Sequence, residues 1–152
     1  MMRIWKTTAF GLIMASFTGC SSSEFLEESP PKAYLEINDH LYETKTGTYC
    51  WKETCVDKVG PLELLKTEKP IEVKANESLS LVIKYKQQPN EKHLVQIQNK
   101  HEVDVPLKKS KLKAPSKTGT YYYYSYSVWW MDENQKNVSN GDALYAFVLE
   151  VK

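Results

Sequence analysis

Arginine is almost absent from this chain of 152 residues, where Arg3 is the only one. The guanidinium group is the side chain best suited to paired hydrogen bonds with phosphates and base edges. Of the 20 lysines and arginines, Arg3 and Lys6 precede residue 19, which leaves 18 lysines to face 19 carboxylates in the rest of the chain. A near-neutral, arginine-free domain predicts no nucleic-acid partner.

The patterns of common catalytic centres are also missing. The sequence contains neither the Gly-Xaa-Ser-Xaa-Gly pattern of a nucleophilic serine nor the His-Glu-Xaa-Xaa-His pattern of a zinc hydrolase. The three histidines, His40, His93 and His101, are dispersed, and no cluster of histidine and cysteine accompanies them. We therefore expect a protein that is not an enzyme and that carries neither a metal nor another cofactor.

Long apolar runs are confined to the N-terminus. Residues 7–18 carry no charge and follow two cations, Arg3 and Lys6. A helix needs about 20 residues to cross a hydrocarbon core, so this run is too short for a permanent span. The order of cations and apolar residues predicts a secretory signal.

The apolar run ends in Phe17-Thr18-Gly19-Cys20, which resembles the lipobox of bacterial lipoprotein precursors. Thr18, Gly19 and Cys20 fit that pattern, whereas Phe17 stands where leucine is usual. The resemblance implies that residues 1–19 are removed and that Cys20 is acylated, so that its lipid chains hold the protein to a membrane. The alternative is an ordinary cleaved signal that leaves a spare thiol.

In size and layout the chain is similar to small lipoproteins of Gram-positive bacteria, which combine a lipobox, a short tether and one β-rich domain. This resemblance implies a location at the extracytoplasmic face of the cell membrane, and only Cys20 is carried over from it. Residues 20–32 are rich in serine, glutamate and proline, which predicts a flexible tether. Residues 33–152 suit one compact domain.

Two cysteines remain once Cys20 is set aside. In an exported protein, Cys50 and Cys55 predict a disulfide. A metal site would need further ligands, and a redox pair favours a two-residue spacing. The cross-link is expected to fix the display of Trp51 and Lys52, which we take as candidate binding residues.

Alternation of apolar and polar residues predicts an antiparallel β-sandwich. The expected strands cover residues 33–38, 71–74, 78–86, 93–98, 103–107, 120–130 and 143–151. The ending consists of an aromatic strand, a polar connection at 131–142 and an apolar strand, and it resembles the final hairpin of an immunoglobulin-like domain.

Aromatic residues are concentrated between residues 120 and 130. In a strand, the even-numbered side chains share one face, and that face is the more apolar, so we assign it to the core. The opposite face carries Tyr121, Tyr123 and Trp129. These three rings are expected to be covered by a neighbouring loop or to bind a sugar or peptide.

Residues 108–117 concentrate lysines in a segment that also contains Pro115. The segment is expected to be a solvated loop, and the alternative is contact with anionic lipid headgroups or wall polymers.

These features predict a membrane-anchored, non-enzymatic binding domain for an envelope protein or peptide. The alternative is a module that binds cell-wall polysaccharide through Tyr121, Tyr123 and Trp129.

Overall fold

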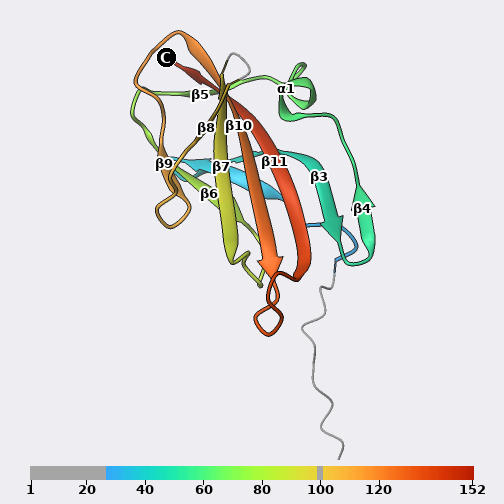
Figure 1. The fold of residues 1–152 in the computed structure, drawn as a ribbon. Coiled ribbons are helices and arrows are strands. Elements are labelled where there is room, and N and C mark those ends of the chain that lie inside the picture. Colours follow the sequence, from blue (N-terminus) through green and yellow to red (C-terminus); the bar gives the residue numbers. More distant parts are fainter. Residues whose placement is uncertain (1–26, 99–100) are drawn as a thin grey trace, which may run out of the picture.

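The computed structural model describes residues 27–98 and 101–152. These residues form antiparallel sheets that pack as a sandwich (Figure 1), which confirms the predicted all-β class. The signal segment 1–19, Cys20 and the first part of the expected tether lie outside the described residues.

The smaller sheet has the strand order β2-β1-β6-β9. Its strands are β1 (Ala33–Ile37), β2 (His40–Glu43), β6 (Ser78–Ile83) and β9 (Lys111–Lys113). Strands β1 and β6 alternate strictly, so Leu35, Leu79 and Leu81 are buried while the intervening side chains are partly exposed. This alternation is what turns one face of the sheet toward the core.

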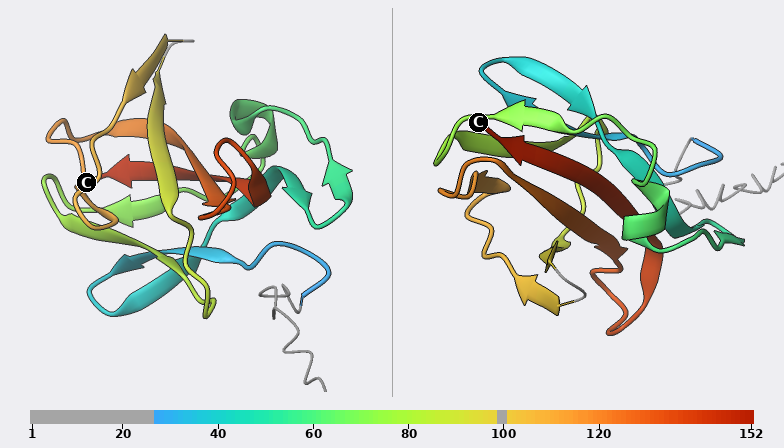
Figure 2. Two further views of the ribbon diagram at one scale, coloured as in Figure 1. Left: turned by 60° about the horizontal axis from the view of Figure 1, so that its bottom comes forward. Right: turned by 90° about the horizontal axis from the view of Figure 1, so that it is seen from above.

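The larger sheet has the order β4-β3-β11-β10-β7-β8, and β5 pairs with β11 in parallel. Its strands are β3 (Lys45–Trp51), β4 (Thr54–Val56), β5 (Ile71–Val73), β7 (Glu91–Gln98), β8 (His101–Asp104), β10 (Thr120–Met131) and β11 (Ser139–Val151). The long pair β10–β11 occupies its centre (Figure 2).

Strands β5 to β11 follow an immunoglobulin-like order. β6 and β9 belong to one sheet, whereas β7, β10 and β11 belong to the other, as do the B, E and C, F, G strands of that fold. The N-terminal strands are an addition, because β1 and β2 extend the smaller sheet while β3 and β4 extend the larger one.

The main core lies between the two sheets, and a second small cluster lies on the outer face of the larger sheet. There, helix α1 (Pro61–Leu64) and the following Leu65 pack on Ala146 and Val148. Strand β11 is therefore covered on both faces, which accounts for the apolar residues on each of them.

The structure corrects several boundaries. Strands β2, β3, β4 and β9 were not predicted, and the polar connection after β10 is shorter than expected. Within the lysine-rich segment, Lys108 and Lys111 pair around a tight turn at Lys109 and Ser110, both with positive φ, so the segment begins as a hairpin rather than a loop.

The described end of the expected tether is also packed rather than free. Pro30 and Pro31 are buried, and the Tyr145 hydroxyl donates a hydrogen bond to the Pro31 carbonyl. The indole Nε1 of Trp51 donates to the Glu27 carbonyl at 2.9 Å. The packed domain therefore begins at Pro30, before the predicted boundary at Ala33.

Candidate functional site

The predicted disulfide is confirmed. Cys50 on β3 and Cys55 on β4 are directly opposite each other in the antiparallel pair, and their sulfurs are bonded at 2.02 Å. Lys52 and Glu53 form the exposed two-residue turn between these strands, and Lys52 has a φ of 55°. Lys52 is thus displayed as expected.

The prediction that this hairpin displays Trp51 is wrong. The Trp51 side chain has 0% exposure, and its ring meets the Trp130 ring edge-on at 4.8 Å between centroids. Successive residues of a strand point to opposite faces, so a disulfide at Cys50 on one face places Trp51 on the inner face. Gly141 makes room for it, because a Cβ there would come within 2.6 Å of the indole.

The even-numbered face of β10 forms the core, as predicted. Tyr122, Tyr124, Tyr126, Val128 and Trp130 are all buried. Tyr124 stacks on Phe147 of β11 with ring centroids 4.9 Å apart. Loss of hydration raises the pKa of the Tyr126 hydroxyl to about 12, and burial raises that of Tyr124 as well. These phenols therefore stay neutral at physiological pH.

The odd-numbered face of β10 does not form one platform. Tyr121 is 49% exposed near the start of the strand, Tyr123 packs beside the α1 cluster, and Trp129 meets His93 edge-on at 5.5 Å near the other end. At about 3.4 Å per residue, Tyr121 and Trp129 are roughly 27 Å apart. The three rings predicted to act together thus belong to separate places on the sheet.

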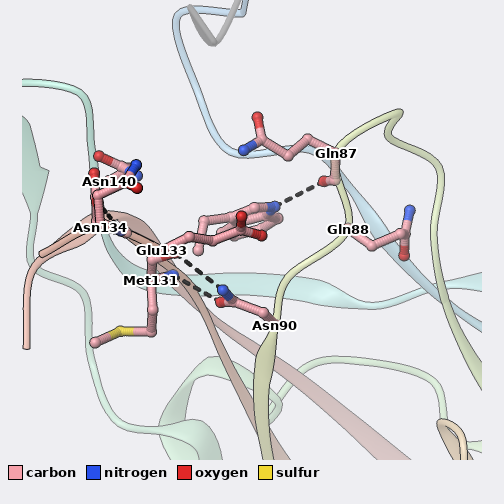
Figure 3. Close-up of a pocket in the computed structure, with 9 residues that line it drawn as sticks. Gln87, Gln88, Asn90, Met131, Glu133, Asn134 and Asn140 are labelled. Carbon is pink, nitrogen blue, oxygen red and sulfur yellow. Dashed lines mark hydrogen bonds between the residues drawn. The ribbon is translucent and has the colours of Figure 1, made fainter. Parts of the chain in front are cut away.

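A polar cavity of about 250 Å³ lies where the segment between β6 and β7 meets the loop between β10 and β11 (Figure 3). Figure 3 shows Gln87 and Gln88 on one side of it and Asn134 and Asn140 on the other. The complete lining consists of Gln87, Gln88, Asn90, Trp130, Met131, Asp132, Glu133, Asn134 and Asn140. We call it the loop-end cavity.

Hydrogen bonds fix the framework of the loop-end cavity. The Asn90 amide donates to the Met131 carbonyl at 3.0 Å and accepts from the Met131 N–H at 2.8 Å, so it joins the two segments in both directions. Trp130 Nε1 donates to the Gln87 carbonyl at 2.8 Å. These three bonds join the segment before β7 to the end of β10, the two parts of the chain that form the cavity.

The loop after β10 is organised by Asp132. Its carboxylate accepts hydrogen bonds from the backbone N–H groups of Asn134 at 2.7 Å and Gln135 at 2.9 Å. These backbone hydrogen bonds lower the pKa of Asp132. In the described part of the chain, by contrast, the side chains of Gln87, Glu133 and Asn134 make no hydrogen bond, so they are available to a ligand.

A more open groove of about 410 Å³ lies toward the opposite end of β11, between β2 and β5. Its lining consists of Ile37, Asn38, His40, Tyr42, Glu72, Val73, Lys74, Glu77 and Lys152. We call it the edge groove, because β2 is the last strand of its sheet. Two large apolar side chains of β2, Leu41 and Tyr42, are 38% and 39% exposed.

The lining of the edge groove includes two carboxylates, Glu72 and Glu77, and two lysines, Lys74 and Lys152, so its formal charges balance. Glu77 accepts hydrogen bonds from the Asn38 amide at 2.7 Å and the Lys74 N–H at 2.8 Å, and the latter bond is the main cause of its lowered pKa. The Lys152 Nζ atom lies 2.6 Å from a carboxylate oxygen of Glu150 and 3.8 Å from one of Glu72. With these charges balanced, the groove offers chiefly apolar surface and strand edge.

The remaining chemistry of the described residues is sparse. His93 and Glu91 are exposed residues of β7, and the His93 Nε2 lies 3.1 Å from a Glu91 carboxylate oxygen. No group of three or more potential metal-binding side chains occurs within 27–98 and 101–152. Among those same residues, no helix has the length and apolarity to cross a bilayer. No protein-family model, curated protein or solved structure matches this chain.

Sequence reasoning missed both depressions. Gln87, Gln88 and Asn90 come from one loop, whereas Met131 ends β10 and the other lining residues up to Asn134 follow it. The bond between Asn90 and Met131 spans 41 positions. The sequence shows only a polar run that contains Pro89 in one loop and a polar run that ends before Gly141 in the other. Such runs predict turns, but they do not predict which two turns lie side by side in the fold.

Proposed function

We propose that the protein is a membrane-anchored, non-enzymatic binding domain that recognises an extended segment of another envelope protein at the edge groove. The observation that supports it is the exposed edge of β2 beside a groove whose charges are already balanced. A sheet edge with unpaired backbone groups can accept a further strand, and nearby pockets can select its side chains.

The hairpin geometry indicates which groups of β2 are available. Ile37 and His40 flank a two-residue turn, where Asn38 and Asp39 have φ values of 49° and 64°. In such a hairpin the flanking pair exchanges both backbone hydrogen bonds, so the N–H and C=O groups of the next residue, Leu41, point away from β1. Leu41 is then the first backbone contact for an added strand.

Photo-crosslinking in intact cells tests this proposal. With a photoreactive amino acid in place of Tyr42, we expect cross-links to one contiguous segment of one envelope protein. Leu41→Pro removes the outward N–H and should abolish them, whereas Leu41→Ala keeps the N–H and should reduce them less. A photoreactive group in place of Val103, which is 58% exposed on β8, is the matched control. Cross-links that scatter, or that survive Leu41→Pro in a folded protein, contradict strand addition.

The anchor is the second part of the proposal. It rests on the lipobox-like residues that end in Cys20, and two or more lipid chains on one residue suffice for stable membrane attachment. Metabolic labelling with a fatty-acid analogue should mark the wild-type protein and not Cys20→Ala. Equal labelling of the two proteins would refute the anchor and leave the groove proposal untouched.

A wall polysaccharide on the outer face of the larger sheet is the second candidate function. It is favoured by the exposure of Tyr121 and the partial exposure of Trp129, because flat aromatic faces stack on sugar rings. Their separation along β10 requires an oligosaccharide long enough to reach both. Binding of wall polysaccharide that is lost in Trp129→Ala would favour this candidate over the edge groove.

A further inference from the structure

The size and the fixed framework of the loop-end cavity limit the kind of ligand that fits it. Its volume of about 250 Å³ corresponds to roughly eight water molecules at about 30 Å³ each. Pockets for drug-sized ligands begin at about 300 Å³, so this one suits a single small ring. Its framework is fixed by hydrogen bonds from both contributing segments.

The available side chains around the cavity both donate and accept hydrogen bonds. Gln87 and Asn134 present amides from opposite sides (Figure 3), and an amide offers two N–H donors and one carbonyl acceptor. A sugar hydroxyl likewise donates one hydrogen bond and accepts others. Amides on two sides of a cavity are thus complementary to a ring with hydroxyl groups on its edges.

Charge argues against the two ionic alternatives. No lysine lines the cavity, and the only charged side chains of its lining are the carboxylates of Asp132 and Glu133, which would repel an anion. Asp132 is already bonded to two backbone N–H groups, which leaves the exposed Glu133 as the one lining carboxylate without a hydrogen bond to a described residue. A single exposed ion pair contributes little in water, so a cation gains little here.

We propose that the loop-end cavity binds a neutral, hydroxyl-rich ring, either a unit of a wall polysaccharide or the headgroup sugar of a glycolipid. The amides of Gln87 and Asn134 bond its hydroxyls, and the indole of Trp130 forms part of the cavity wall. This site is separate from the edge groove, since the two lie toward opposite ends of β11.

The test uses the full-length protein, first in detergent with an array of neutral oligosaccharides and then, with the detergent removed, in vesicles that contain or lack a glycosyl diacylglycerol. We expect a neutral sugar to bind, with a change in tryptophan fluorescence because Trp130 borders the cavity. Binding to the array alone indicates a polysaccharide source, and binding to glycolipid vesicles above the plain vesicles indicates a headgroup source.

Variants decide whether the cavity is responsible. Gln87→Ala and Asn134→Ala should each weaken binding by about three- to tenfold, the loss expected for a neutral hydrogen bond. Gln135→Ala, in the same loop but outside the lining, should bind like the wild type. Glu133→Gln should also bind, because it keeps the hydrogen-bonding group and removes only the charge.

Three results would overturn the proposal. They are the absence of any sugar or vesicle response, equal binding by Gln87→Ala, Asn134→Ala and the wild type, and loss of binding in Glu133→Gln, which would indicate a cationic ligand. Leu41→Pro should leave sugar binding unchanged, so failure at the edge groove is distinguishable from failure here.

Discussion

Both faces of the larger sheet carry aromatic side chains, but these are buried on one face and partly exposed on the other. On the inner face, Trp51, Tyr126 and Trp130 are buried, because the smaller sheet covers them. On the outer face, Trp129 keeps partial exposure, because α1 and Leu65 cover only the part of the sheet near Tyr123 and Val148. Whether an aromatic side chain belongs to the core or can contact a ligand thus depends on what covers its face of the sheet, and not on the type of residue.

The largest expected effect separates two tryptophans on these faces. Trp51→Ala removes a fully buried ring and should lower the free energy of unfolding by about 3–5 kcal/mol. Trp129→Ala removes a partly exposed ring that meets the His93 ring edge-on, and should lower the free energy of unfolding by less than about 1 kcal/mol. Urea unfolding followed by circular dichroism measures both. Equal losses of unfolding free energy in the two variants would contradict the difference in burial between the two faces.

Alkaline pH should destabilise the protein through the buried tyrosines of the inner face. Burial raises the pKa of Tyr126 to about 12, and tyrosine in the unfolded chain ionises near 10. The folded state therefore holds the proton more tightly, so stability is complete below pH 10 and falls as the pH rises toward 12. The loss attributable to Tyr126 is roughly 2–3 kcal/mol.

Urea titrations across this pH range measure the loss, and tyrosinate absorbance reports the ionisation. The variant Tyr126→Phe should lose less stability between pH 10 and pH 12 than the wild type. A wild-type stability that stays constant up to pH 12 would contradict the burial argument.

The disulfide should stabilise the protein by a different mechanism from the core. Closing so short a loop is worth about 2 kcal/mol, mainly through the unfolded chain. The double variant Cys50→Ala/Cys55→Ala should lose that amount in urea unfolding. Its near-ultraviolet circular dichroism should stay native, because Trp51 is held by Trp130 and Tyr85 on the inner face. A lost aromatic signal would mean that the cross-link also positions the indole.

Local alternation was sufficient to predict much of the fold. Ser78–Ile83 and Thr120–Met131 alternate clearly, so their strands and the buried face of β10 followed from the sequence. The short strand Lys111–Lys113 did not, because three residues show too little alternation to distinguish a strand from a loop. The same limit hid β2 and β4.

The candidate site was harder to predict than the fold. The spacing of Cys50 and Cys55 indicated a disulfide. No strand was predicted between residues 38 and 71, however, so the alternation of faces that buries Trp51 in β3 did not enter the prediction. Gly47, Tyr49 and Trp51 occupy alternate positions, and this pattern could have indicated a strand with Trp51 on its inner face. Both depressions depend on segments that meet only after the sheets have paired, and single-sequence patterns carry no information on such meetings.

The hydrogen bond from Trp51 to the Glu27 carbonyl makes the two ends of the sandwich different. It holds Glu27, the first described residue, at the end of the sandwich where the loop-end cavity lies. If Cys20 is acylated as proposed, the seven residue steps to Glu27 span at most about 25 Å. The 13 residues of β11 then carry the edge groove about 40 Å farther from that end. One end of the domain would thus sample the bilayer surface, while the other reaches outward to partners beyond it.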